Sequence, residues 1–297
     1  MYTDDSLNSI IEDYPVNQLQ KTICKYLNKT GIFYRIFGRR KTSESIIRKI
    51  ELKNYNQSNR MQDLFGIRIA LYFKDDISIC RDLIEKKFEV VDISEDIQDK
   101  DHFKPTRLNY VCRIPSKIKE TINNELWSLY PIDDTFEIQI RTVFSEGWHE
   151  IEHDLRYKCQ KDWENEIEAS RALNGILATL EVCDWSIITM FDNLAYKMYQ
   201  SGNWEAMIRN KFRIRLFPSN MSSELTDIFN ADKTIAKEFL KVDRNEFIKD
   251  LFSFEKASNL QKNYNNLIYS INHLYIHNED ISLITPIPIT QAFISKT

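Results

Sequence analysis

The stretch Phe136-Glu137-Ile138-Gln139-Ile140-Arg141-Thr142 alternates apolar and polar residues. This two-residue period is typical of a β-strand that is buried on one side only. Such a strand places Glu137, Gln139 and Arg141 on one face of a sheet and the three apolar side chains on the other. The stretch therefore predicts a strand with a carboxylate and a guanidinium on its polar face.

A second run, Leu64 to Phe73, is mostly apolar, follows directly after Asp63 and contains Arg68. The two strand regions together supply two carboxylates and two arginines, with no cysteine or histidine pair nearby. Because Mg²⁺ prefers oxygen ligands, this combination favours a hard cation that holds a polyphosphate. An ordinary sheet with Glu137 and Arg141 on its solvated face explains the same pattern equally well.

Composition limits the classes of protein that fit. The chain has 297 residues, of which 42% are hydrophobic and 28% charged, so it is globular and long enough for one large domain or two ordinary ones. A net charge of −4 gives no overall attraction to nucleic acid. The six glycines form no GxGxxG or GxxxxGK[ST] motif, so side chains must bind any phosphate. Five scattered cysteines, an acidic N-terminus without an apolar core and no long apolar segment predict a soluble, cytoplasmic protein.

Strand-like and helix-like periods alternate over the first half of the chain, which predicts an α+β fold with a mixed β-sheet flanked by helices. After Arg141 the period becomes helical, and a change in composition near residues 200–203 suggests a boundary between residues 1–200 and a mainly helical region, 201–297. The expected strands are 32–37, 67–73, 88–93, 108–114 and 135–141, and the expected helices among them are 7–29, 43–53, 77–87 and 116–130.

The most basic segment is GRRKTSESIIRK, residues 38–49. If a helix begins near Ser43, Ser45 and Lys49 are neighbours one turn apart, while Arg39 and Lys41 precede the helix in a loop. A helix N-terminus surrounded by cations suits a phosphate tail. A solvated, charged helix is the usual alternative for a basic run.

Four segments follow one another in a recognisable order: GRRKTSESIIRKI (38–50), DLFGIRIALYF (63–73), FKPTRLNYVCRIP (103–115) and EIQIRTVFSEGWHEIEHDLRYK (137–158). This succession resembles the RelA/SpoT synthetase family, the alarmone synthetases, over about residues 30 to 160. The resemblance implies a nucleotidyltransferase-like synthetase domain. It also implies a Mg²⁺-dependent GTP pyrophosphokinase activity, in which the β,γ-pyrophosphate of ATP moves to the 3′-hydroxyl of GTP or GDP and gives (p)ppGpp, the alarmone of the stringent response.

The resemblance also implies roles for matching positions. Asp63 and Glu137 would be the catalytic residues and the Mg²⁺ ligands, with Glu137 able to accept the proton of the attacking hydroxyl. Arg39 and Arg68 would cover the two faces of the donor adenine. The remaining ATP-binding residues would be Lys41, Ser45 and Lys49, and the acceptor-binding residues would be Arg107, Asn109, Gln139 and Arg141.

One departure from the family pattern leaves the acceptor open. The family carries a tyrosine that stacks on the acceptor guanine and a nearby histidine, where this chain has Pro105 and Asn109. The alternative to GTP or GDP is a toxic pyrophosphotransferase acting on the 3′ end of tRNA or on adenine nucleotides, as in a toxin–antitoxin pair. A non-enzymatic ATP sensor is a third hypothesis, although a pure binder does not need the second carboxylate. Residues 201–297 would close over the site, mediate oligomerisation or bind a neutralising protein partner.

The pair His153-Asp154 superficially matches the HD signature of metal-dependent hydrolases. It lies inside the helix expected after residue 141, and the other four histidines are scattered along the chain. We therefore expect His153 to pack or hydrogen-bond beside the active site and not to bind a metal.

Overall fold

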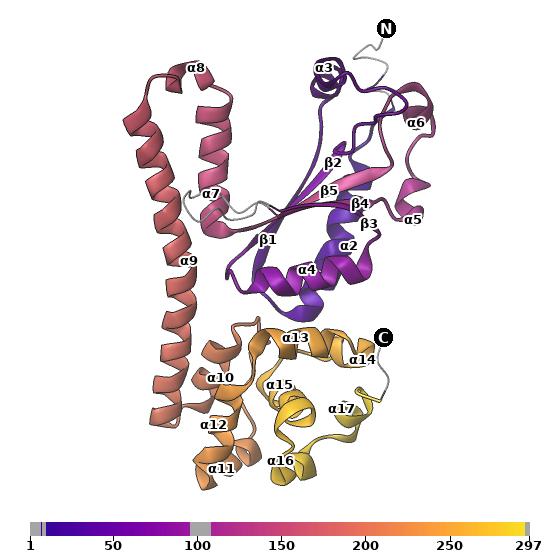
Figure 1. Ribbon diagram of the computed structural model, residues 1–297. Helices are drawn as coiled ribbons and strands as arrows, with labels where there is room; N and C mark the ends of the chain where they lie inside the picture. Colours follow the sequence, from indigo (N-terminus) through magenta and orange to yellow (C-terminus); the bar gives the residue numbers. More distant parts are fainter. Residues whose placement is uncertain (1–6, 8–9, 96–107, 295–297) are drawn as a thin grey trace. The chain divides into compact units, whose positions relative to one another are not determined.

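The computed structural model describes residue 7 and residues 10–95 and 108–294 (Figure 1). These residues form two compact units. The first takes the described residues of Met1–Lys25, Tyr34–Tyr72 and Leu83–Glu181, and the second takes those of Tyr26–Phe33, Phe73–Asp82 and Val182–Thr297. Among the helices that the structure describes, none combines the length and the apolar character that a membrane crossing requires.

A five-stranded sheet in the order β1-β2-β5-β4-β3 organises the first unit. The central pair, β2 and β5, is parallel, and the other neighbours are antiparallel, so the sheet is mixed as predicted. The strands are β1 Tyr34–Arg40, β2 Phe65–Leu71, β3 Val90–Glu95, β4 Leu108–Arg113 and β5 Thr135–Thr142.

Both units contain helices, and α2, α4 and α9 each contribute residues to both units. The predicted helix 116–130 is two short helices, because the turn at residues 120–124 interrupts it. The helices up to residue 201 are α2 Tyr14–Thr30, α3 Ser43–Lys53, α4 Asp76–Lys87, α5 Ser116–Lys119, α6 Glu125–Leu129, α7 Val143–Ile151, the π-helix η1 Glu152–Tyr157, α8 Gln160–Trp163 and α9 Ile167–Ser201.

Alternation along the strands gives the sheet one apolar face, which forms the core of the first unit. Ile67 and Ile138 are in register on β2 and β5, and both are fully buried. On this face Gly38 of β1 lies against α2, where Gln20 Nε2 donates to the carbonyl of Ile36. Tyr110 of β4 donates its hydroxyl proton to a carboxylate of α4. Helices α2 and α4 therefore cover the apolar face, and the opposite face is left to polar side chains.

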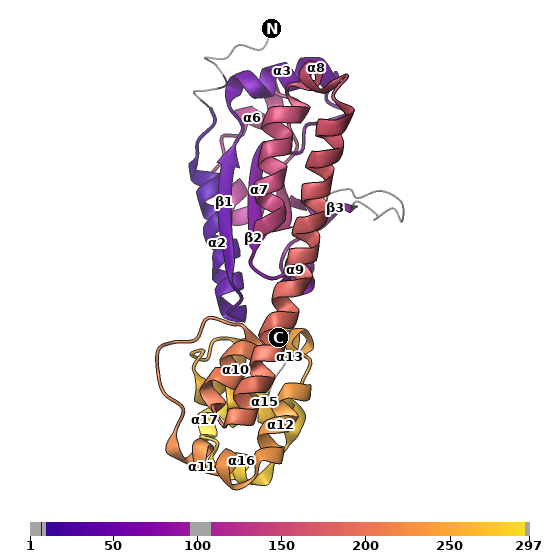
Figure 2. The same cartoon turned by 90° about the vertical axis from the view of Figure 1, so that its left-hand side faces the viewer.

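Helix α7 begins directly at the end of β5. Thr142 caps it through a reciprocal capping box with Ser145, which satisfies backbone N–H groups at the helix start. Trp148 of α7 donates its indole N–H to the carbonyl of Leu173 at 2.8 Å, and α7 runs beside α9 in both views (Figures 1 and 2). The direction of α7 is thus fixed at both ends.

The second unit is helical, which confirms the predicted helical C-terminal region. Its core is rich in fully buried phenylalanines that meet edge to face: the ring centroids of Phe229 and Phe239 are 5.3 Å apart, and those of Phe212 and Phe247 are 5.6 Å apart. Its remaining helices are α10 Trp204–Phe212, α11 Ser223–Ala231, α12 Lys233–Lys241, α13 Arg244–Phe252, α14 Glu255–Ser258, α15 Tyr264–Ile271, η2 Asn272–Ile276, α16 Glu279–Ile284 and α17 Ile287–Gln291.

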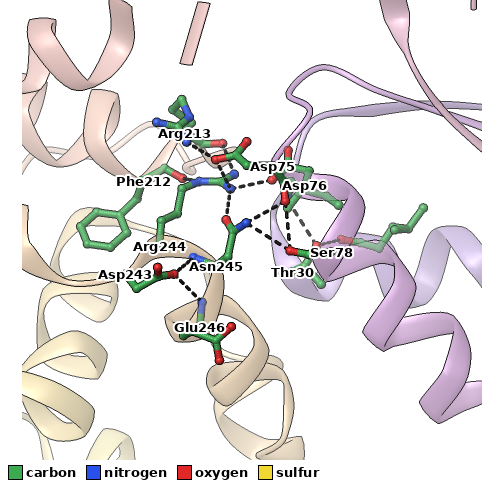
Figure 3. Close-up of polar contacts among 12 residues, drawn as sticks. Thr30, Asp75, Asp76, Ser78, Phe212, Arg213, Asp243, Arg244, Asn245 and Glu246 are labelled. Atoms are coloured by element: carbon green, nitrogen blue, oxygen red, sulfur yellow. Dashed lines mark hydrogen bonds and ion pairs between the residues drawn. The ribbon is translucent and has the colours of Figure 1, made fainter. Parts of the chain in front are cut away.

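A buried cluster of charges lies inside the second unit (Figure 3). Arg213 Nη2 is 2.5 Å from Asp75 Oδ2, and Arg244 Nη1 is 2.6 Å from Asp76 Oδ1. Asn245 joins the cluster by donating to the carbonyl of Asp75 at 2.7 Å. The carboxylate of Asp76 is fully buried, and this burial outweighs the attraction of Arg244 and raises the pKa of Asp76 to about 6.

This pKa predicts how the stability of the second unit depends on pH. In the unfolded chain Asp76 titrates near 3.8, so between that value and about 6 the folded state binds more protons. The free energy of unfolding contributed by Asp76 therefore falls as pH rises. Relative to Asp76→Asn, which does not titrate, the wild type should lose up to about 3 kcal/mol over this range. Urea unfolding of both proteins at a series of pH values measures the free energy of unfolding of wild type minus that of Asp76→Asn. If this difference stays constant or rises with pH, the raised pKa of Asp76 is wrong.

Candidate active site

The polar face of the sheet gathers predicted site residues through the strand register. Arg68 on β2 is in register with Gln139 on β5, which is in register with Asn109 on β4. Residues in register on neighbouring strands project to the same face of a sheet. Three residues far apart in sequence therefore form one polar row.

A second row of residues on the same face lies two residues earlier along β2. Arg39 on β1 is in register with Gly66 on β2, and Gly66 is in register with Glu137 on β5. The sequence placed Arg39 in a loop before α3, which is wrong: Arg39 is a strand residue, because β1 continues to Arg40 to pair with β2. Glycine at position 66 leaves space between the arginine and the carboxylate.

This space belongs to a small cavity of about 60 Å³ on the polar face, referred to below as the carboxylate cavity. It is lined by Phe37, Arg39, Lys41, Asp63, Gly66, Ile67, Arg68, Glu137 and Gln139. Both carboxylates predicted to bind a metal are therefore part of one cavity, together with three of the predicted ATP-binding residues.

Asp63 is the most strongly constrained carboxylate of this cavity. Its Oδ2 atom is 2.5 Å from Lys49 Nζ and 3.2 Å from Lys41 Nζ. Burial raises the pKa of Asp63, but the two ammonium groups outweigh burial and hold that pKa below its ordinary value. The other oxygen, Oδ1, is buried and has no hydrogen-bond partner among the described residues. A cation is the natural partner for an ionised, unpartnered carboxylate oxygen, so the donor set fits a hard metal ion.

The second carboxylate is held by the polar row. Gln139 Nε2 donates to Glu137 Oε2 at 3.1 Å, and Gln139 Oε1 accepts from Arg68 Nε at 3.2 Å. Because the amide of Gln139 bridges these two groups, it fixes the orientation of the Glu137 carboxylate. Gln139, predicted as an acceptor-binding residue, thus also positions Glu137.

Two glutamates that the sequence reasoning missed come from α7. Arg68 Nη1 contacts Glu146 Oε1 at 2.7 Å and also a carboxylate oxygen of Glu150. Arg141 is buried, and its Nη1 donates to Glu146 Oε2 at 3.1 Å. The spacing of four residues between Glu146 and Glu150, directly after the strand, is the sequence signal that could have placed both on one face of α7.

A second cavity of about 210 Å³ adjoins the first and shares Arg39, Arg68 and Gln139 with it; we call it the α7 cavity. Its lining combines the polar row with residues of α7 and η1: Arg39, Arg68, Asn109, Gln139, Arg141, His149, Glu150, Glu152, His153 and Tyr157.

The remaining predicted residues lie in different places. Ser45 is in the first turn of α3, where its Oγ accepts from Thr42 Oγ1 at 2.8 Å and its backbone N–H is capped by the same hydroxyl. Its part in ATP binding stays a prediction. Arg107 and Pro105 lie outside the described residues. His153 lines the α7 cavity, and its Nδ1 is hydrogen-bonded to Asp154 Oδ1 at 2.9 Å.

Comparison with known proteins identifies the family that part of the chain matches. Residues 38–162 match the family described as "Region found in RelA / SpoT proteins". Over 142 residues the chain is 31% identical to GTP pyrophosphokinase YjbM of Bacillus subtilis. The aligned segment covers 46% of this chain and 63% of that protein. The chain thus spans less than two thirds of that relative's length.

Two solved structures resemble parts of the chain. Small alarmone synthetase 1 from Bacillus subtilis superposes with a TM-score of 0.47 at 24% identity, covering 63% of this chain and 96% of that one. A GTP pyrophosphokinase family protein from Streptococcus pneumoniae superposes with a TM-score of 0.45 at 22% identity, covering 58% and 84%. On the sequence match, residues 38–162 of this chain correspond to the region found in RelA/SpoT proteins.

Proposed function

We propose that this chain is a Mg²⁺-dependent pyrophosphokinase that transfers the β,γ-pyrophosphate of ATP to the 3′-hydroxyl of GTP or GDP. The observation that carries the proposal is Asp63, an ionised carboxylate with two lysine ammonium groups on one oxygen and a buried, unpartnered second oxygen. It lines the same cavity as Glu137. Cations, a metal-binding oxygen and a second carboxylate in one place are what phosphoryl-type transfer requires.

The roles that we propose for the individual side chains are those that the family resemblance implies. Asp63 and Glu137 would hold Mg²⁺, which when bound neutralises charge on the phosphate oxygens. Lys41 and Lys49 would bind the donor phosphates once the ion takes their place at Asp63. Glu137, oriented by Gln139, would accept the proton of the attacking hydroxyl.

The donor base would lie between the guanidinium groups of Arg39 and Arg68, both of which line the two adjoining cavities. Arg68 is held by Glu146 and Glu150 in the free protein, so its side chain is already fixed over the polar row. A fixed guanidinium loses less conformational entropy when it stacks on a base.

The proposal also covers the role of residues 201–297 and the identity of the acceptor. We place the synthetase in residues 1–200 and assign residues 201–297 to oligomerisation or to a neutralising protein partner. Because Pro105 replaces the tyrosine of the family pattern, the 3′ end of tRNA and adenine nucleotides are the alternative acceptors, and they would make the chain a toxic pyrophosphotransferase.

A product assay tests the reaction directly. Incubation with ATP, Mg²⁺ and GTP or GDP should release AMP and form the guanosine pentaphosphate or tetraphosphate, and chelation of Mg²⁺ should stop both. Anion-exchange chromatography of reactions with labelled ATP separates all products. Label transfer only to ATP, ADP or tRNA would assign the alternative acceptor, whereas no AMP with any acceptor would refute the pyrophosphokinase and favour a nucleotide sensor.

A further inference from the structure

The proposed function gives no role to an aromatic pair on η1, His153 and Tyr157. The rings of His153 and Tyr157 are 5.8 Å apart between centroids and inclined by only 13°, so they stack in parallel. Both side chains line the α7 cavity. Tyr157 is 61% exposed and the His153 side chain 50% exposed, so the pair is not part of the hydrophobic core.

The backbone and a neighbouring charge hold this pair in place. Residues Glu152–Tyr157 form a π-helix, a rare local structure that is frequent at functional sites. Asp154 Oδ1 is 2.9 Å from His153 Nδ1 and 2.6 Å from Lys158 Nζ. Hydrogen bonds from Lys158 and His153 lower the pKa of Asp154, so its carboxylate is ionised and stays paired with both side chains. The imidazole ring is thereby fixed in one plane.

The cavity also offers polar recognition. Asn109 Oδ1 is buried and has no hydrogen-bond partner among the described residues, although an amide oxygen can accept two hydrogen bonds. Leaving such an atom buried and unpaired is costly, so a ligand with an N–H group at its edge would bind favourably there. Arg68 and Arg39 line the same cavity and supply guanidinium planes.

We propose that the stacked pair His153–Tyr157 is a nucleobase platform. A base would stack on the exposed aromatic surface, as bases do on aromatic side chains of single-strand binding proteins, and its N–H edge would donate to Asn109 Oδ1. The proposal rests on the proposed function, because it assigns the base to one of the two nucleotides of the pyrophosphate transfer. The chemistry recognised is a flat base with an N–H donor. Because the proposed function places the donor base between Arg39 and Arg68, we assign the platform to the base of the acceptor nucleotide.

Equilibrium binding distinguishes base stacking from phosphate binding. Calorimetric titrations of wild type, Tyr157→Ala, Tyr157→Phe and His153→Ala would use ATP, GTP, GDP and inorganic tripolyphosphate, a probe with no base. Tyr157→Ala should weaken binding of at least one nucleotide about tenfold, or about 1.4 kcal/mol, and leave tripolyphosphate unchanged. Tyr157→Phe, which keeps the ring, should restore binding. Leu155→Ala is the matched control, since Leu155 is equally exposed on η1 but does not contribute to the described lining of either cavity.

The pattern of losses decides the outcome. A loss confined to GTP or GDP supports the platform for the acceptor base, and in the product assay the KM of that nucleotide should rise more than kcat falls. A loss confined to ATP would overturn this assignment and also the placement of the donor base between Arg39 and Arg68. Unchanged nucleotide affinity in both Tyr157→Ala and His153→Ala would overturn the platform. An equal loss for tripolyphosphate, or the same loss in Leu155→Ala, would overturn it too. Should wild type release no AMP while Tyr157→Ala still loses nucleotide affinity, the platform stands and the proposed reaction fails.

Discussion

Glu137→Gln should reduce kcat for AMP release about 10³-fold, while the affinity for ATP without Mg²⁺ changes little. Glutamine has the size of glutamate and can still accept the hydrogen bond from Gln139 Nε2, so the polar row is kept. It cannot take up a proton from the acceptor hydroxyl, and it is a weaker ligand for Mg²⁺. Single-turnover assays at saturating nucleotide measure the loss.

A neutralised glutamate elsewhere on the same unit provides the control for this prediction. Glu51→Gln changes an exposed residue of α3 that lies outside both described cavity linings, and its activity should match wild type. Full turnover in Glu137→Gln would show that this carboxylate is neither a metal ligand nor a general base.

Gly66→Val should reduce kcat/KM for ATP about 100-fold and leave the fold intact. A Cβ atom at position 66 would meet only Arg39, at 3.8 Å and beyond, so the backbone of β2 tolerates a side chain. The branches of valine, however, would enter the carboxylate cavity between Arg39 and Glu137, which holds only about 60 Å³. Valine favours strands, so thermal stability should be equal to or higher than that of wild type.

The matched variant here is Gly66→Ala, whose single methyl group makes ordinary van der Waals contact. Its activity should stay within a few fold of wild type. Initial-rate kinetics together with thermal unfolding separate a blocked cavity from a damaged sheet. Wild-type kcat/KM in Gly66→Val would mean that the nucleotide does not use this cavity.

Local patterns were sufficient to predict much of the fold. The two-residue period of Thr135–Thr142 marks β5 because its apolar side chains must face a core, and the sheet is mixed as the alternation of elements indicated. Boundaries were less accurate where pairing decides them. β1 was expected to end at residue 37, yet it extends to Arg40 because β2 offers hydrogen-bond partners along its whole length.

The candidate site also contains residues that the sequence predicted and residues that it missed. The resemblance read from four segments predicted Asp63, Lys41, Arg68 and Glu137, and these residues line one cavity. Glu146 and Glu150 were missed, because their partner Arg68 is 78 and 82 positions away along the chain. The sequence by itself determined which face of each strand is polar, since that follows from period and burial alone. Only the tertiary structure decided which charges meet: the parallel register of β2 and β5, together with the direction of α7, brings together side chains that no local pattern relates.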